Sequence, residues 1–252
     1  MPTNAPRLSV VIPAYNEAER IERTLQRIVE YLDSRGESYE ILVVSDGSTD
    51  ATEALVERFA QTHPQVQLLA YQPNRGKGYA VRYGILRARG ERILFSDADL
   101  ATPIEELEKL EPYLERGYAI AIGSRPLRES QLIVRQPLYR EMAGRAFNKV
   151  VQLLAVRGIH DTQCGFKLFT REAAHDIFSR CRFDSFSFDF ETLYYAQRLG
   201  YPIAEVPIRW MHQEGSKVRL LRDGLRMLRD LIWLRLNGWR GVPLKAEAAR
   251  RK

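Results

Sequence analysis

The chain has 252 residues, enough for one large α/β domain or one and a half. Its 45% hydrophobic and 28% charged residues are ordinary for a soluble globular protein. No apolar run approaches the roughly 18 residues of a spanning helix, and residues 1–7 lack the apolar core of a signal peptide, so we do not expect an integral membrane protein. The two cysteines, Cys164 and Cys181, lack disulfide-framework and metal-site spacing, which favours reduced thiols and a cytoplasmic location.

The net charge of +6 is unevenly distributed along the chain. Residues 217–252 contain eleven Lys or Arg and three acidic residues, a net of +8, whereas the rest of the chain contains 27 basic and 29 acidic residues. Such a local basic excess indicates contact with an anionic surface and argues against general nucleic-acid binding.

The first 90 residues alternate between strand and helix patterns. Each apolar strand pattern is followed by a turn rich in glycine, proline or capping oxygens, and each turn leads into a helix with one apolar face. The predicted strands are 8–13, 39–44 and 66–70, the turns are 14–17, 45–50 and 73–78, and the helices end near Ser34, Ala60 and Ala88.

A fourth predicted strand ends in two carboxylates, Asp97 and Asp99, spaced i, i+2. At the end of a strand this spacing lets both carboxylates approach one pole of a divalent cation such as Mg²⁺ or Mn²⁺. Taken alone, acidic residues before a helix are more often caps. A helix over 104–115 and a fifth strand over 118–122, which leads into Arg125, complete the pattern.

This alternation predicts an α/β fold with a mostly parallel, doubly wound sheet and helices on both faces. Ligands bind such sheets at the carboxyl ends of the strands. The first strand leads into a Pro-containing turn instead of a glycine-rich one, and no Walker A pattern occurs, which disfavours dinucleotide dehydrogenases, P-loop enzymes and sugar nucleotidyltransferases. Residues suited to a site, each of which alone could be a cap or turn residue, stand at every strand end: Tyr15, Glu17, Asp46, Gly47, Gly76, Lys77, Asp97, Asp99 and Arg125.

Together these motifs resemble the family 2 glycosyltransferases, whose catalytic domain has the Rossmann-like GT-A fold. The resemblance runs from Leu8 to about Trp239, and the second half most resembles the members that transfer glucose to dolichyl phosphate. It matches the related dolichyl-phosphate mannose synthases less well. The stretches that carry the resemblance are VVIPAYNE (10–17), VVSDGSTD (43–50), NRGKG (74–78), DAD (97–99), GSR (123–125), DTQCGFKLF (161–169), FDFE (188–191) and EGSK (214–217).

The resemblance implies a site for a UDP-sugar and for a divalent metal, Mg²⁺ or Mn²⁺. Asp97 would contact the ribose or the metal, Asp99 would ligate the metal, and Lys77 would lie near the base or the diphosphate. The mannose synthases carry a further metal ligand, a glutamine, where this chain has Ala101, which implies fewer protein ligands here. The implied nucleotide-sugar-binding residues are Pro13, Ala14, Tyr15, Glu17, Asp46, Gly76, Lys77, Asp97, Ala98, Ser216 and Lys217.

The implied reaction is an inverting displacement of UDP from glucose by a polyprenyl phosphate. A phosphate monoester is largely dianionic at neutral pH, so it needs cations rather than a general base. Relatives with hydroxyl acceptors place their base at the position of Asp189, so a hydroxyl acceptor stays open as an alternative, as does GDP-mannose as the donor. The implied catalytic residues are Asp99, Arg125, Arg140 and Asp189, with Arg125 and Arg140 at the acceptor phosphate and Arg135 and Arg145 as further candidates.

Residues 216–241 predict a basic amphipathic helix. Leu221, Leu225, Leu228 and Ile232 recur at helical spacing beside four arginines, and Trp233 and Trp239 close the segment. Such a helix either lies on an anionic membrane or packs its leucine face on the core. We therefore expect a catalytic domain over 1–215, this interfacial segment over 216–241, a disordered tail over 242–252, and peripheral attachment to the cytoplasmic face of a membrane, with residues 133–156 as a second interfacial element.

Overall fold

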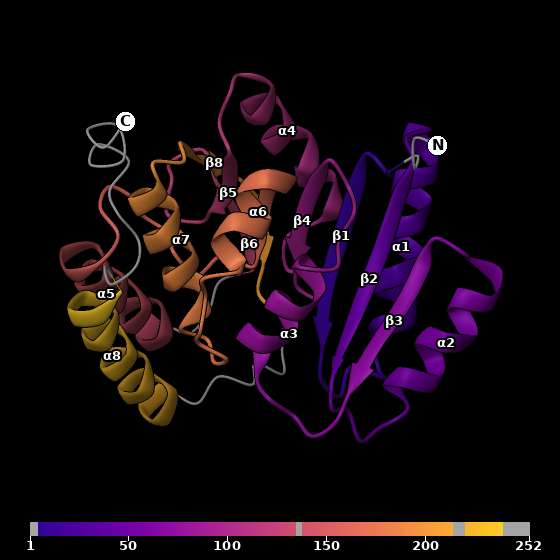
Figure 1. Cartoon of the computed structure of the whole chain (residues 1–252), viewed down its shortest axis with the longest axis horizontal. Helices are drawn as coiled ribbons and strands as arrows, with labels where there is room; N and C mark the ends of the chain where they lie inside the picture. The colour runs from indigo at the N-terminus through magenta and orange to yellow at the C-terminus, as the bar shows by residue number, and fades with distance from the viewer. Residues whose placement is uncertain (1–4, 135–137, 214–219, 239–252) are drawn as a thin grey trace, which may run out of the picture.

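A seven-stranded sheet with helices on both faces forms the centre of the molecule (Figure 1). The computed structural model describes residues 5–134, 138–213 and 220–238. This sheet with its two layers of helices confirms the expected α/β fold. The predicted tail over 242–252 lies outside the described residues, and the division of the chain at 215 stays a prediction.

The strand order is β3-β2-β1-β4-β7-β5-β8. The sheet is mostly parallel, as predicted, but β7 runs antiparallel to both of its neighbours. Every side chain from Phe166 to Phe169 is buried, as a strand in the middle of a sheet requires. The strands are β1 (Leu8–Ala14), β2 (Tyr39–Asp46), β3 (Val66–Tyr71), β4 (Arg92–Ser96), β5 (Ile120–Ser124), β7 (Phe166–Thr170) and β8 (Ile203–Pro207).

Two buried clusters, one on each face of the sheet, form the core. Apolar residues of α1, α2 and α4 pack on one face, and those of α3, α5, α6, α7 and α8 pack on the other. The helices are α1 (Ile21–Arg35), α2 (Thr52–Thr62), α3 (Lys77–Ile85), α4 (Leu107–Glu115), α5 (Leu138–Leu154), α6 (Arg171–Phe178), α7 (Phe188–Leu199) and α8 (Leu220–Asn237).

Several element boundaries differ from the sequence prediction. The third helix begins at Lys77, two residues early, because Gly76 adopts a φ of +108° that turns the chain sharply into α3. It also ends at Ile85, three residues early. The predicted helix over 104–115 starts as a 3₁₀ turn, Ile104–Glu106. A small parallel sheet of β6 (Gln131–Val134) and β9 (Arg209–Met211) was not predicted.

Helix α8 packs beside α5, at the side of the molecule away from β3 (Figure 1). Its core-facing stripe is Met227, Leu231 and Leu234, which are at most 5% exposed. Of the leucine stripe proposed from the sequence, Leu225, Leu228 and Ile232 face outward. The idea that this stripe packs on the core was therefore wrong. Within the ranges that the structure describes, no helix is both long and apolar enough to cross a membrane.

Candidate active site

The carboxyl ends of β1, β2 and β4 lie at one edge of the sheet, the lower edge in Figure 1, because these strands are parallel. This edge receives the turns after Ala14 and Asp46 and the start of α3. It also receives Asp97 and Asp99, which follow β4 directly. The predicted cluster of strand-end residues is therefore brought together, as the topology requires.

Asp97 forms an ion pair with Lys77, the first residue of α3, with 2.6 Å between Nζ and Oδ1. The Asp97 amide donates to the Gly165 carbonyl at 3.1 Å. A Cβ atom added to Gly165 would overlap the Asp97 carboxylate, so a larger residue there would have to displace that carboxylate. The sequence identified Gly165 only as part of a family-like stretch, because its partner is 68 residues away.

Asp99 lies in the turn after β4, where its Oδ1 accepts a hydrogen bond from the Ala101 amide at 2.9 Å. Burial and the neighbouring Asp97 raise the pKa of Asp99. Leu100, between Asp99 and Ala101, has a left-handed φ of +46°, a strained conformation for a leucine. Two carboxylates held together in a partly desolvated turn fit a divalent cation, since its charge would relieve their repulsion.

Protein ligands for such a cation are few. Among the residues that the structure describes, no group of three His, Cys, Asp or Glu side chains could hold a metal ion. Asp97 and Asp99 would therefore supply at most two side chains, and the remaining ligands would come from the diphosphate and water. The expectation of fewer protein ligands, based on Ala101, stays a prediction.

Lys77 lies among three carboxylates. Burial alone would lower the pKa of Lys77, but Asp97, Asp189 and Asp99 together raise it. Its ammonium group therefore stays charged, and it is positioned beside the two candidate metal ligands. Such a cation can neutralise an anionic group brought to this edge of the sheet.

Asp46 holds the glycine-rich turn. Its carboxylate accepts hydrogen bonds from the backbone amides of Arg75 and Gly76 at 2.7 and 2.8 Å. It also accepts the Tyr71 hydroxyl at 2.8 Å and the side-chain amide of Asn74 at 2.9 Å. Asp46 is 3% exposed. All these bonds shape the loop, so the structure assigns Asp46 a positioning role, while its implied contact with the nucleotide-sugar stays a prediction.

The remaining predicted nucleotide residues lie at the same edge but differ in exposure. Ala14 and Ala98 are buried, and the Ala98 carbonyl accepts the Thr24 hydroxyl at 2.7 Å. Tyr15 is exposed, and Glu17 pairs with Arg20 at 2.9 Å. Pro13 lies near the end of β1. Ala14 and Ala98 thus belong to the buried core, and their contact with a nucleotide stays a prediction.

The loop from Arg182 to Ser187, called here the bridging loop, packs on the glycine-rich turn. The amides of Gly78 and Tyr79 donate to the Asp184 carbonyl at 2.9 and 3.3 Å. Added Cβ atoms at Gly76 and Gly78 would overlap carbonyl oxygens of this loop. Both glycines are therefore required for close packing, and the implied nucleotide contact of Gly76 stays a prediction.

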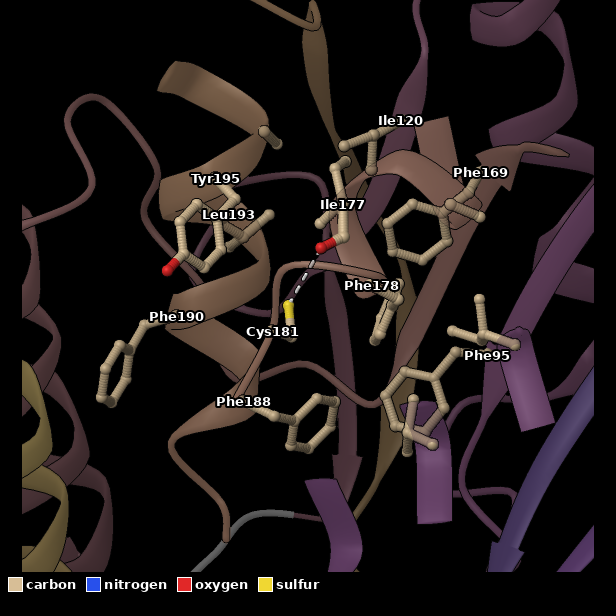
Figure 2. Close-up of a cluster of buried hydrophobic side chains, with 14 of the residues drawn as sticks. Phe95, Ile120, Phe169, Ile177, Phe178, Cys181, Phe188, Phe190, Leu193 and Tyr195 are labelled. Atoms are coloured by element: carbon tan, nitrogen blue, oxygen red, sulfur yellow. Dashed lines mark hydrogen bonds between the residues drawn. The ribbon is translucent and has the colours of Figure 1, made fainter. Parts of the chain in front are cut away.

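Asp189 lies in the first turn of α7 and forms an ion pair with Lys167 of β7. Asp189 is 4% exposed and Lys167 1%. The Lys167 ammonium also donates to the Cys164 carbonyl at 2.8 Å. It lies 5.6 Å from the ring centre of Phe95, which packs edge-on against Phe188 (Figure 2). The sequence did not reveal this partner of Asp189.

Glu191, two residues after Asp189, has a structural role. Its carboxylate accepts the amides of Arg182 and Phe183, both at 2.9 Å, and so fixes the start of the bridging loop. Burial raises its pKa to about 7. Preferring Asp189 to Glu191 as a candidate site residue is consistent with these contacts.

Arg125 follows β5 and forms a two-point contact with Asp161. Its Nε and Nη2 donate to the two carboxylate oxygens at 2.6 and 2.8 Å. Although burial opposes it, Arg125 holds the pKa of Asp161 below its usual value. The fork of the guanidinium group is thus occupied, so a phosphate would have to use its remaining N–H groups. The role of Arg125 at a phosphate stays a prediction.

Other candidates are located only in part. Arg140 and Arg145 lie on α5, while Arg135, Ser216 and Lys217 lie outside the described residues. Both cysteines are buried, and burial raises the pKa of the Cys164 thiol to about 12, so neither has the features of a reactive thiol. Cys181 points to the Ile177 carbonyl inside the apolar cluster (Figure 2).

Comparisons with known proteins show what the chain is similar to. Residues 9–178 match the glycosyl transferase family 2. The chain is 42% identical over 250 residues to the dolichyl-phosphate β-glucosyltransferase of Drosophila melanogaster, covering 92% of this chain and 77% of the relative. It is 41% identical over 243 residues to the enzyme of the same name from Homo sapiens, and this match covers 91% of this chain and 75% of the relative.

The fold also matches a solved structure. Glucosyl-3-phosphoglycerate synthase from Mycobacterium tuberculosis, solved with Mn²⁺, UDP-glucose and glycerol 3-phosphate, superposes with a TM-score of 0.65. The match covers 94% of this chain and 81% of that chain at 20% sequence identity. This likeness establishes the architecture alone.

Proposed function

The chain belongs to the glycosyl transferase family 2, and we propose that it transfers glucose from UDP-glucose to a polyprenyl phosphate of the dolichyl type, with inversion at the sugar. The observation that carries the proposal is the cluster of Asp97, Asp99 and Lys77 at the strand ends, since a nucleotide-sugar diphosphate needs this combination of metal ligands and a cation. The choice of glucose and dolichyl phosphate rests on relatives about 40% identical over most of the chain.

Asp97 and Asp99 would hold Mg²⁺ or Mn²⁺. When bound, such a metal stabilises negative charge on a leaving diphosphate. Lys77 adds a fixed positive charge beside these carboxylates. The ion pair to Lys77 holds the Asp97 carboxylate, and the hydrogen bond to the Gly165 carbonyl holds the Asp97 backbone, before any ligand arrives. This preorganisation is the main contribution that a protein can make to charge stabilisation.

The bond changes need no proton transfer. An oxygen of the acceptor phosphate forms a bond to the anomeric carbon, and the bond from that carbon to UDP breaks, its electron pair remaining on the diphosphate. The acceptor oxygen is already ionised at neutral pH. The arginines proposed to hold the acceptor phosphate are Arg125 and Arg140. The contact between Lys167 and Asp189 supports this chemistry, because a carboxylate engaged by an ammonium group is poorly placed to accept a proton.

A hydroxyl acceptor is the second candidate, and one observation favours it. Burial raises the pKa of Asp189 against the opposing effects of Lys167 and Lys77, which would make Asp189 a stronger base. GDP-mannose as the donor is a related alternative. We favour the phosphate acceptor because of the occupied carboxylate and the specific similarity to dolichyl-phosphate β-glucosyltransferases.

We further propose that the outer faces of α5 and α8 rest on the cytoplasmic surface of a membrane. Helix α8 exposes Leu225 (71%) and Leu236 (62%), and α5 exposes Leu153 (81%). Exposed large apolar residues on adjacent helices mark an interaction surface. The arginines of α8, among them Arg222, Arg226 and Arg229, suit anionic lipid head groups. Peripheral attachment would bring the site to a lipid-linked acceptor.

A transfer assay tests the function. The purified protein is incubated with radiolabelled UDP-glucose, Mn²⁺ and a short polyprenyl phosphate in detergent, and label is measured in the organic phase. We expect label with the wild type and its loss in Asp99→Ala. The control Glu57→Ala changes an exposed carboxylate on α2 and should retain transfer. Label that stays in the aqueous phase with a water-soluble acceptor would support the hydroxyl alternative instead.

A further inference from the structure

The bridging loop, 182–187, connects three parts of the molecule. It packs on the glycine-rich turn through the Asp184 carbonyl, and Asp184 also pairs with Arg82 of α3 at 2.6 Å. It leads directly into α7, which carries Asp189 in its first turn. Its third contact is with α8. A shift of this loop would therefore move both sides of the donor site together.

Asp230 makes a polar contact between α8 and this loop. It is 6% exposed on the core-facing side of a helix whose other charges are mostly arginines. Its Oδ2 accepts the Ser187 hydroxyl at 2.7 Å and the Ser185 hydroxyl at 3.3 Å. Its Oδ1 accepts the Arg229 guanidinium at 3.0 Å. A buried carboxylate with these partners fixes the position of the groups that it binds.

Ser187 is completely buried and stands at the N-cap position of α7. An N-cap serine ordinarily accepts a hydrogen bond from the first turn of its own helix. In the described part of the chain, Ser187 makes no such bond, and its hydroxyl donates to Asp230 instead. The start of α7 is thus anchored to α8 in place of its own cap.

A second contact joins the same two segments. Trp233, one helical turn after Asp230, packs edge-on against Phe183 of the bridging loop, with ring centres 5.7 Å apart. The Phe183 carbonyl in turn lies against Gly78. Helix α8 therefore contacts the loop at both ends, at Phe183 and at Ser187.

We propose that Asp230 is a positioning residue of the donor site, which acts through Ser187 and the bridging loop on the turn that carries Lys77. The inference rests on the proposed function in that the ligand of this turn is a UDP-sugar. It gives α8 a second role, since its inward face supports donor binding while its outward face lies toward lipid. Replacing Asp230 would loosen the loop and the Lys77–Asp97 pair, although Asp230 itself does not contact the nucleotide.

The test is the affinity for UDP with Mn²⁺, measured by calorimetry on the full chain without lipid. We expect Asp230→Ala to raise the dissociation constant about tenfold, because it removes hydrogen bonds to a charged acceptor. Asp230→Asn keeps an oxygen for Ser187 and should stay within about threefold. Ser187→Ala should weaken UDP binding by up to the same factor, because it removes the shortest of the bonds to Asp230. The double variant should bind no more weakly than Asp230→Ala, since that change already removes the Ser187–Asp230 bond.

Asp33→Ala is the matched control, because Asp33 also lies on a helix and accepts a hydroxyl bond, from Tyr39 at 2.6 Å, but near the opposite ends of the strands. We expect it to leave the UDP affinity unchanged. If Asp230 has a purely structural role, Asp230→Ala should lower the melting temperature and kcat. If Asp230 is a positioning residue, Asp230→Ala should raise the KM for UDP-glucose. If Asp230→Ala does not fold, Ser187→Ala decides.

Unchanged UDP affinity in folded Asp230→Ala or Ser187→Ala would overturn the inference and leave the proposed function standing. A wild type that binds UDP but transfers no label to lipid would refute only the acceptor. A wild type that binds no UDP would refute the proposed donor and the inference with it.

Discussion

Lys167 and Asp189 form a buried ion pair between the antiparallel strand β7 and the first turn of α7. The pair lies close enough to the Lys77–Asp97 pair that Asp189 raises the pKa of Lys77. Two lysines and three aspartates thus form one electrostatic unit at the carboxyl edge of the sheet. Because charges within such a unit depend on one another, changing one partner should alter both the stability of the fold and the binding of the donor.

Replacing Asp189 distinguishes a phosphate acceptor from a hydroxyl acceptor. If the acceptor is a phosphate, Asp189→Asn should lower kcat by less than about tenfold, because no proton has to be removed. If Asp189 were a general base, the loss would be on the order of 10²–10⁴-fold. Steady-state kinetics with polyprenyl phosphate measure this difference, and a loss in the larger range would contradict the proposed chemistry.

Lys167→Met should destabilise the fold, because it leaves the Asp189 carboxylate buried without its cation. Breaking one side of a buried pair costs about 3–5 kcal/mol. The double variant Lys167→Met/Asp189→Asn should regain most of that stability, since the uncompensated charge is gone. Chemical denaturation measures both changes, and a double variant as unstable as Lys167→Met would show that the pair is not the cause.

Gly165→Ala should weaken donor binding with little effect on folding. The added methyl group would displace the Asp97 carboxylate, and misplacing a catalytic group by about 1 Å costs up to 10²-fold in activity. Gly144→Ala on α5 is the matched control, because its Cβ would meet no described atom within 4 Å. Equal kcat/KM for UDP-glucose in the two variants would exclude a role for Gly165 in holding Asp97.

The raised pKa of Asp99 predicts the pH dependence of metal binding. Only the ionised carboxylate binds a cation. The affinity for Mn²⁺ is therefore highest above the pKa of Asp99, and it is lost as the pH falls through that pKa. Since burial and Asp97 raise this pKa, the loss should begin above the ordinary aspartate value of 3.8. Titration of Mn²⁺ binding with UDP would reveal the midpoint. A midpoint at or below 3.8, or the same profile in Asp99→Ala, would contradict the assignment.

Membrane contact predicts a graded response to changes on α8. Leu225→Ala and Leu236→Ala should each weaken binding to vesicles that contain anionic lipid by roughly tenfold, since burying a leucine contributes about 1.5–3 kcal/mol. Leu86→Ala changes a half-exposed leucine (39% exposed) just after α3 and serves as the control. Co-sedimentation measures the binding, and equal binding by all three variants would argue against α8 as the contact.

The strand ends and the Asp97–Asp99 pair could be predicted because their signals are local. Strand periodicity, turn residues and the i, i+2 spacing all lie within a few residues of one another. The ion pairs around the site could not be predicted. Arg125 and Asp161 are 36 residues apart in the sequence, and Lys167 and Asp189 are 22 residues apart. They meet only because β7 enters the middle of the sheet, and no local pattern encodes that step.

The orientation of helix α8 could not be predicted from the sequence, for a different reason. The stripe of Leu225, Leu228 and Ile232 and the stripe of Met227, Leu231 and Leu234 both have helical spacing, so periodicity alone could not identify which one faces the core. The role of Asp230 depends on Ser187, which is 43 residues away in the sequence, so helical spacing alone does not reveal it.

The most direct measurement of the central claim is a competition between donors. Wild-type protein receives equal concentrations of UDP-glucose and GDP-mannose, each with a different radiolabel, together with polyprenyl phosphate in detergent, and initial rates of label entering the organic phase are compared. The account predicts that the glucose label enters the organic phase much faster than the mannose label. Faster transfer of mannose, or no label of either kind in the organic phase, would contradict it.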